Sequence, residues 1–131
     1  MPIDTRTVFY GTGSGRVVRH LSNRGVSERN VTKVDISAFS GTYSQVDLIE
    51  YSVWGFGSVE LGWAHTPTDS IAVLQGNGVI DWAAVGGKTD PTGVSTDGTG
   101  DVVLTTATEG LIASTLANSA GYDITLWMRM K

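Results

Sequence analysis

The chain has 131 residues, no cysteine and a formal net charge of −4. This length suits one domain with its own hydrophobic core, and the absence of cysteine excludes disulfides, thiolate zinc sites and cysteine nucleophiles. With 40% apolar and 17% charged residues the composition is typical of neither disordered nor membrane proteins. No apolar run approaches the ~20 residues of a spanning helix.

Charge is unevenly distributed along the chain. Residues 1–36 carry six basic and three acidic residues, whereas residues 37–131 carry three basic and ten acidic ones. We therefore predict that residues 1–30 form a basic N-terminal extended arm with a first hairpin, ahead of a body at 31–131. Its arginines would contact a negative surface or simply solvate an edge: Arg6, Arg16, Arg19, Arg24 and Arg29. Sparse basic residues without interleaved aromatics argue against nucleic acid as a partner.

The first segments read as strands. Residues 5–10 and 16–22 flank the glycine-rich GTGSG, and two strands joined by such a turn predict a hairpin. A phosphate site is disfavoured, because GTGSG lacks the spacing of a dinucleotide-binding or P-loop motif. Residues 31–39 alternate in period two, with Lys33 and Val34 on opposite faces. In 45–54 the apolar positions change face after Leu48, which is what a β-bulge does.

The remaining segments complete about eight strands. In 57–65, Val59, Leu61 and Trp63 share a predicted inward face, and 69–76 and 100–107 follow. The last strand, 121–130, has one apolar face: Tyr122, Ile124, Leu126, Met128 and Met130. Only 107–120 has helical spacing, and it fits a hairpin equally well. Short strands between turns predict an all-β fold, an antiparallel β-sandwich or jelly roll.

The stretch TDPTGVSTDGTGD, residues 89–101, contains three aspartates, as a calcium-binding loop would. Neither Asp90 nor Asp97 starts an EF-hand register, and Asp-Pro and Asp-Gly are turn signals. A turn is the preferred interpretation, and a weak calcium site at Asp97 and Asp101 stays open. We predict no cofactor and no resident metal.

Catalytic chemistry finds little support. The two histidines, His20 and His65, have no nucleophile elbow or metal-ligand spacing around them. We predict that the chain is not an enzyme. A hydrolase of unrecognised type would need one of these histidines beside a Ser, Asp or Glu in a concave site.

Tryptophans are the most informative side chains. Trp127 stands on the polar face of its strand, next to Arg129, and exposed aromatic and arginine side chains often anchor protein interfaces. We predict that both contribute to a subunit or partner contact. Trp54 and Trp82, with Trp127, are the alternative stacking platforms for a sugar.

Several segments between residues 34 and 131 resemble small structural proteins of tailed bacteriophages, particularly marine ones. These are VDIS (34–37), IEYSVWGFGSVELGW (49–63), GNGVIDW (76–82), GDVVLTT (100–106) and GYDITLWMRMK (121–131). The resemblance implies a non-enzymatic β-sandwich of the virion, most like a capsid decoration (cement) protein made in the host cytoplasm.

Partners follow from the same resemblance: the major capsid protein and further copies of this chain, with a trimer favoured. No membrane partner is expected. A tail, fibre or host-attachment module that binds carbohydrate is the alternative.

Overall fold

The computed structural model describes six stretches of the chain: 3–11, 16–35, 44–64, 69–89, 101–107 and 120–130. Within them the chain forms ten strands and one short 3₁₀ helix, Ala83–Val85. Every strand pairing is antiparallel, so the predicted all-β class is confirmed. The predicted helix or hairpin at 107–120 lies outside the described residues, apart from its two ends. No helix in these stretches has the length and apolar character that are needed to cross a membrane.

The larger sheet has the strand order β1-β2-β10-β4-β7. The short strand β8 also pairs with β4, at a different part of that strand from β7. Its strands are β1 (Ile3–Gly11), β2 (Arg16–Arg24), β10 (Gly121–Met130), β4 (Ser44–Trp54), β7 (Asn77–Asp81) and β8 (Lys88–Thr89). The predicted first hairpin is the pair β1 and β2.

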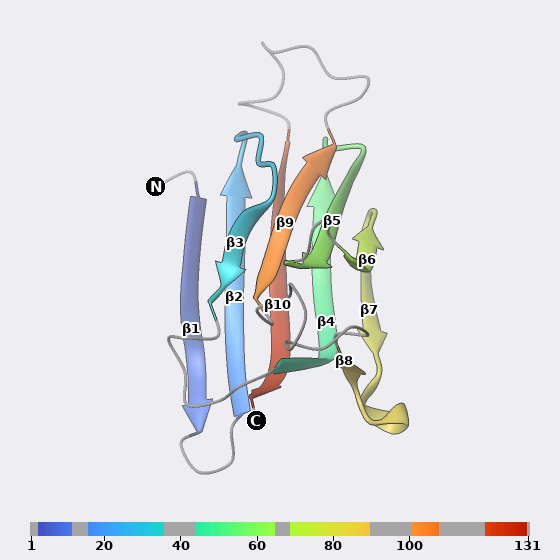
Figure 1. Cartoon of the computed structure of the whole chain (residues 1–131). Helices are drawn as coiled ribbons and strands as arrows, with labels where there is room; N and C mark the ends of the chain where they lie inside the picture. Colours follow the sequence, from blue (N-terminus) through green and yellow to red (C-terminus); the bar gives the residue numbers. More distant parts are fainter. Residues whose placement is uncertain are drawn as a thin grey trace.

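The smaller sheet has the order β3-β9-β5-β6. Its strands are β3 (Val31–Val34), β9 (Val102–Ala107), β5 (Ser58–Trp63) and β6 (Asp69–Leu74). Figure 1 shows this sheet stacked in front of the larger one, with β3 over β2 and β5 over β4.

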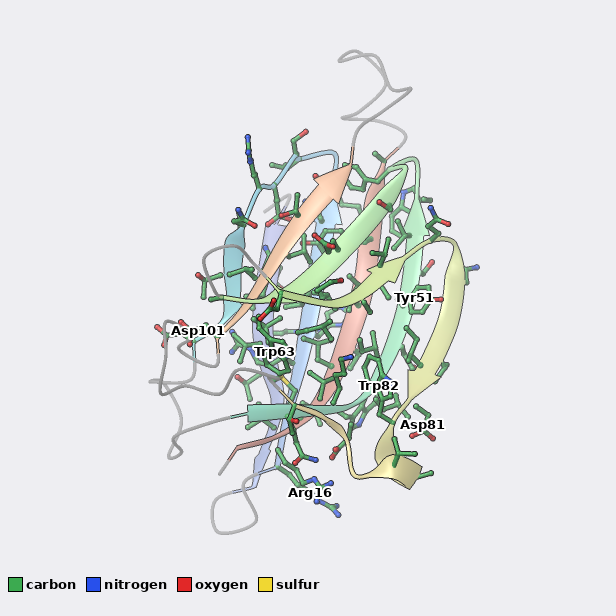
Figure 2. All side chains as sticks on the ribbon, turned by 45° about the vertical axis from the view of Figure 1, so that its right-hand side comes forward. Arg16, Tyr51, Trp63, Asp81, Trp82 and Asp101 are labelled. Carbon is green, nitrogen blue, oxygen red and sulfur yellow. The ribbon has the colours of Figure 1, made fainter. Side chains whose placement is uncertain are left out.

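One hydrophobic core fills the space between the sheets. The predicted inward faces are confirmed: Val59, Leu61 and Trp63 are buried, as are Tyr122 and the alternate residues that follow it on β10. Figure 2 shows Trp63 between the two sheets, and it has no exposed surface. The side chain of Met130 lies outside the described residues. Alternation therefore identified the core side of both strands, because a strand presents every second residue to the same face.

The change of face predicted in β4 is also present. Val46 pairs with Met128 and Leu48 pairs with Trp127, so Asp47 is an additional residue in β4. Val46 and Ile49 are buried, whereas Asp47 and Leu48 between them are half-buried. The bulge thus turns two successive side chains to the outer face of the larger sheet.

The N-terminal residues correct the expectation of a separate arm. Residues 16–24 form β2, an interior strand between β1 and β10. Val17 and Leu21 of this strand are buried in the core. The arginines of the segment suggested an arm, but a strand buries only one face, and its other face and ends can carry charge.

Lys33 corrects a second expectation. Alternation placed Lys33 and Val34 on opposite faces, yet both are buried. The register of β3 against β9 shifts between Thr32 and Val34, so Lys33 is the additional residue of a bulge. That bulge brings an ammonium group into the interior.

Candidate functional site

A groove of about 620 Å³ opens on the outer face of the larger sheet. Its floor is Trp127 of β10, which lies between Val18 of β2 and Leu48 of β4 in the strand register. Arg16 and Arg129 pair with each other two residues further along β2 and β10, beside this apolar row, and also line the groove. We call this surface the outer groove.

The Asp47 bulge builds the wall of the outer groove. The Nε of Arg129 donates to Asp47 Oδ2 at 2.8 Å, and its NH2 nitrogen donates to Oδ1 at 3.2 Å. This two-point contact fixes the planes of both groups. Gln45 Nε2 donates to Asp47 Oδ1 and to the carbonyl of Gly86, each at 2.8 Å.

Asp47 is charged at neutral pH as a result. Burial by itself raises the pKa of this carboxyl, and the hydrogen bonds from Arg129 and Gln45 lower it. The positive charges of Arg129 and Arg16 act in the same direction, and the pKa is below its ordinary value. The backbone N–H of Trp82 donates to the Asp47 carbonyl at 2.8 Å, which ties the bulge to the segment after β7.

The predicted interface residues divide into two groups. Arg16, Trp127 and Arg129 meet in the outer groove. Arg6 is exposed on the edge strand β1, and Arg29 is exposed in the connection after β2. Arg6 and Arg29 are not among the residues that line the outer groove.

Arg19 and Arg24 have local structural contacts. Arg19 donates to Thr7 Oγ1 at 2.7 Å and to the backbone carbonyl of Lys33 at 3.0 Å, so it joins the two sheets. Burial lowers the pKa of its guanidinium. Arg24 donates to Asp123 at 3.3 Å and lies 4.9 Å from the centroid of the Trp54 ring.

The other candidate sugar platforms are partly covered. Trp54 carries the Arg24 guanidinium on its ring. Trp82 packs against the core and has the Lys88 ammonium 5.9 Å from its ring centroid. Trp127, by contrast, lines the outer groove.

His20 and Asp101 are the histidine and metal candidates among the described residues. His20 Nδ1 lies 3.2 Å from Thr125 Oγ1, and Nε2 lies 3.8 Å from Asp123 Oδ1. His65 and Asp97 lie outside the described residues, and Asp101 accepts the N–H of Ala64 through its backbone carbonyl. The described stretches hold no group of three His, Asp or Glu residues placed to bind a metal.

The structure contains a buried polar cluster that was not predicted from the sequence. Asn23, Glu28, Lys33 and Tyr122 meet between the sheets at the end of β2, and each is at most 5% exposed. Glu28 and Lys33 were counted as surface charge of the N-terminal segment. Nothing local in the sequence marks them, because their partners come from β3 and from β10, 94 residues further along the chain.

Comparison with known proteins found no matching family model, no matching curated protein and no matching solved structure.

Proposed function

We propose that this chain is a non-enzymatic jelly-roll protein of a phage virion, most like a capsid decoration protein. The strand order supports the jelly roll. The orders β2-β10-β4-β7 and β3-β9-β5-β6 describe two four-stranded sheets between which the chain crosses repeatedly, with β5 and β6 as the only direct hairpin among these strands. That is the connectivity of two interleaved Greek keys, a fold used by viral capsid and lectin domains.

The outer groove is the observation that carries the binding role. An apolar row, Val18, Trp127 and Leu48, lies on the outward face of the larger sheet, with Arg16 and Arg129 beside it. Tryptophan and arginine are the side chains that most often dominate protein interfaces. We assign this face to contact with the major capsid protein or a neighbouring copy in a trimer, and this assignment replaces the N-terminal arm.

Quantitative mass spectrometry of gradient-purified particles tests the virion assignment. A decoration protein is present at a copy number comparable to the major capsid protein. A few copies per particle would instead indicate a tail or attachment component, and absence from the particles would overturn the proposal.

The groove assignment has its own test in particle-binding assays. Trp127→Ala should weaken binding to undecorated particles by about tenfold or more. Val73→Ala serves as the control, since Val73 is 56% exposed on β6 of the opposite sheet. Equal binding by the two variants would remove the outer groove from the interface.

Saccharide binding is the second candidate, and one feature favours it. The Trp127 ring lines a concave site together with Glu50 and the planar Asp47–Arg129 pair, which combines a stacking surface with hydrogen-bonding groups. A panel of saccharides should then quench the intrinsic fluorescence of wild type and of Trp54→Ala but not of Trp127→Ala. No quenching of the wild-type protein by any saccharide would exclude this function.

A further inference from the structure

The buried cluster at the end of β2 brings an amine, a carboxyl and a carboxamide together. The side chains of Lys33 and Glu28 are 3% and 1% exposed, and Asn23 has no exposed surface. Glu28 is held in place through its backbone, which donates to Thr106 Oγ1 and accepts from the Thr106 N–H, each at 2.9 Å. All three functional groups are therefore shielded from water, and the Glu28 backbone is held by two hydrogen bonds.

Glu28 contacts the other two groups with its two different oxygens. Lys33 Nζ forms an ion pair with Oε2. Asn23 Nδ2 donates to Oε1 at 2.7 Å, and the Tyr122 hydroxyl donates to the same oxygen. Among the described residues no other donor reaches Oε2, so the lysine is its partner.

Asn23 is oriented by the backbone of Val26. The Val26 N–H donates to Asn23 Oδ1 at 2.9 Å, and Asn23 Nδ2 donates to the Val26 carbonyl at 2.7 Å. This double contact distinguishes the two ends of the carboxamide. It places the carbonyl oxygen on an N–H donor and the amide nitrogen on the Glu28 carboxyl.

A buried ion pair of this kind is costly to maintain. Removing two charges from water carries a desolvation penalty that their attraction offsets only in part. A reaction that turns the lysine and the carboxamide into a neutral amide would relieve that penalty. Proximity favours such a reaction, because groups held in one rigid site react as if at very high concentration.

We propose that Lys33 and Asn23 are joined by an intramolecular isopeptide bond, formed with Glu28 as the catalytic proton carrier. Lys33 Nζ first gives a proton to Glu28 Oε2, which leaves a neutral amine. The nitrogen lone pair attacks Cγ of Asn23, and the carbonyl electrons move to Oδ1, where the Val26 N–H stabilises the developing charge.

The second half of the reaction expels ammonia. The Glu28 carboxyl turns about its Cγ–Cδ bond so that the protonated Oε2 faces Asn23 Nδ2, and it delivers the proton there. The Cγ–Nδ2 bond then breaks and the carbonyl re-forms. Nζ, which now carries a positive charge, returns a proton to the Glu28 carboxylate. The products are a Lys33–Asn23 side-chain amide, free ammonia and a neutral Glu28, with no oxidant or other reactant required.

The bond would connect the two sheets covalently. Asn23 belongs to β2 of the larger sheet and Lys33 to β3 of the smaller one. In a chain without cysteine it would supply the cross-link that a disulfide provides elsewhere. The inference does not depend on the proposed function.

Intact mass and a tryptic map of the purified full chain test the proposal. The expected mass is that of the sequence less one ammonia. The map should lack the free peptides 20–24 and 30–33, and should contain a branched peptide in which 20–24 is attached to 30–88, since trypsin does not cleave at an acylated lysine. A full-mass protein that releases both free peptides overturns the proposal.

Variants separate this bond from other losses of ammonia. A succinimide at Asn23 has the same mass but leaves Lys33 cleavable, and that result would also refute the link. Lys33→Arg should keep full mass, while Lys88→Arg, the control, should show the deficit. Glu28→Ala, checked for folding by circular dichroism, should retain full mass; a branched peptide in this variant would remove Glu28 from the reaction.

Discussion

At the scale of single residues, Tyr122 shows how burial affects a titratable group. It has no exposed surface, and its hydroxyl donates to Glu28. Burial, followed by the hydrogen bond and charge of Glu28, raises the pKa of Tyr122 far above its ordinary value. The folded protein therefore holds this proton at pH values where an unfolded chain releases it.

Stability should fall at alkaline pH for this reason. Above about pH 10 the unfolded state binds fewer protons than the folded state, so the free energy of unfolding decreases as the pH rises. Tyr122→Phe should lose about 1–3 kcal/mol at neutral pH, because Glu28 Oε1 loses one of its two hydrogen-bond donors and keeps Asn23 Nδ2. Urea unfolding across the alkaline range should show a shallower decline for Tyr122→Phe than for wild type. Parallel declines would contradict the assignment.

Asp47 gives the opposite dependence on pH. Its pKa is lowered in the folded protein, so its contribution is present above the ordinary aspartate pKa of about 3.9 and is lost as the pH falls through the lower folded value. The Arg129 and Asp47 side chains are 38% and 19% exposed, and water screens the pair. Asp47→Asn should therefore cost no more than about 1 kcal/mol at pH 7.

Urea unfolding of wild type and Asp47→Asn at neutral and acidic pH measures this effect. The gap between the two proteins should close in acid. Asp4→Asn, an exposed position on β1, is the control and should show little gap at either pH. A gap that stays constant with pH would mean that the charge of Asp47 contributes nothing.

At the scale of elements, Gly121 limits how closely β10 approaches its neighbours. A Cβ added there would lie 2.5 Å from the backbone carbonyl oxygen of Asn23 and 2.6 Å from the Trp54 ring. Backbone oxygen cannot move aside without disturbing the β2–β10 pairing. The strand therefore requires a residue without a side chain at this position.

Gly121→Ala should destabilise the protein by about 1–3 kcal/mol. Gly78→Ala is the matched control in β7, where the added atom would meet only the side chain of Tyr51, 2.7 Å from its hydroxyl oxygen. Thermal unfolding of the two variants should show a larger decrease for Gly121→Ala. The reverse order would indicate that Trp54 and β2 yield more easily than the structure implies.

At the scale of the whole molecule, β2 cannot be separated from the domain. It lies between β1 and β10 and contributes Val17 and Leu21 to the core. Removing residues 1–30 should leave a chain without cooperative unfolding, because β10 would lose the strand that pairs with Leu126 and Tyr122 on one side. Removing residues 1–11 deletes only the edge strand and should preserve the transition.

Circular dichroism with thermal melting distinguishes these truncations. If the fragment 31–131 folded cooperatively, the N-terminal segment would be an appendage after all. The arginines of residues 1–30 would then be explained by a basic arm that contacts a negative surface.

The sequence by itself predicted eight of the ten described strands, all but β7 and β8, and the inward faces of β5 and β10. Alternation in β5 and β10 identified Leu61, Trp63, Tyr122 and Leu126 as core, because the period of two is a property of each strand alone. It also located the bulge of β4 to within a residue or two. Trp127 and Arg129, which the sequence pattern placed together on one face of the last strand, both line the outer groove.

Tertiary structure decided what depends on partners distant in the chain. The bulge at Lys33 exists only in the register of β3 against β9, and it turns a lysine that alternation had placed opposite Val34 into the interior. The meeting of Asn23, Glu28, Lys33 and Tyr122 needs both sheets and a contact across 94 residues. Local patterns carry no record of such pairings, because a strand's own alternation is the same whichever strand lies beside it.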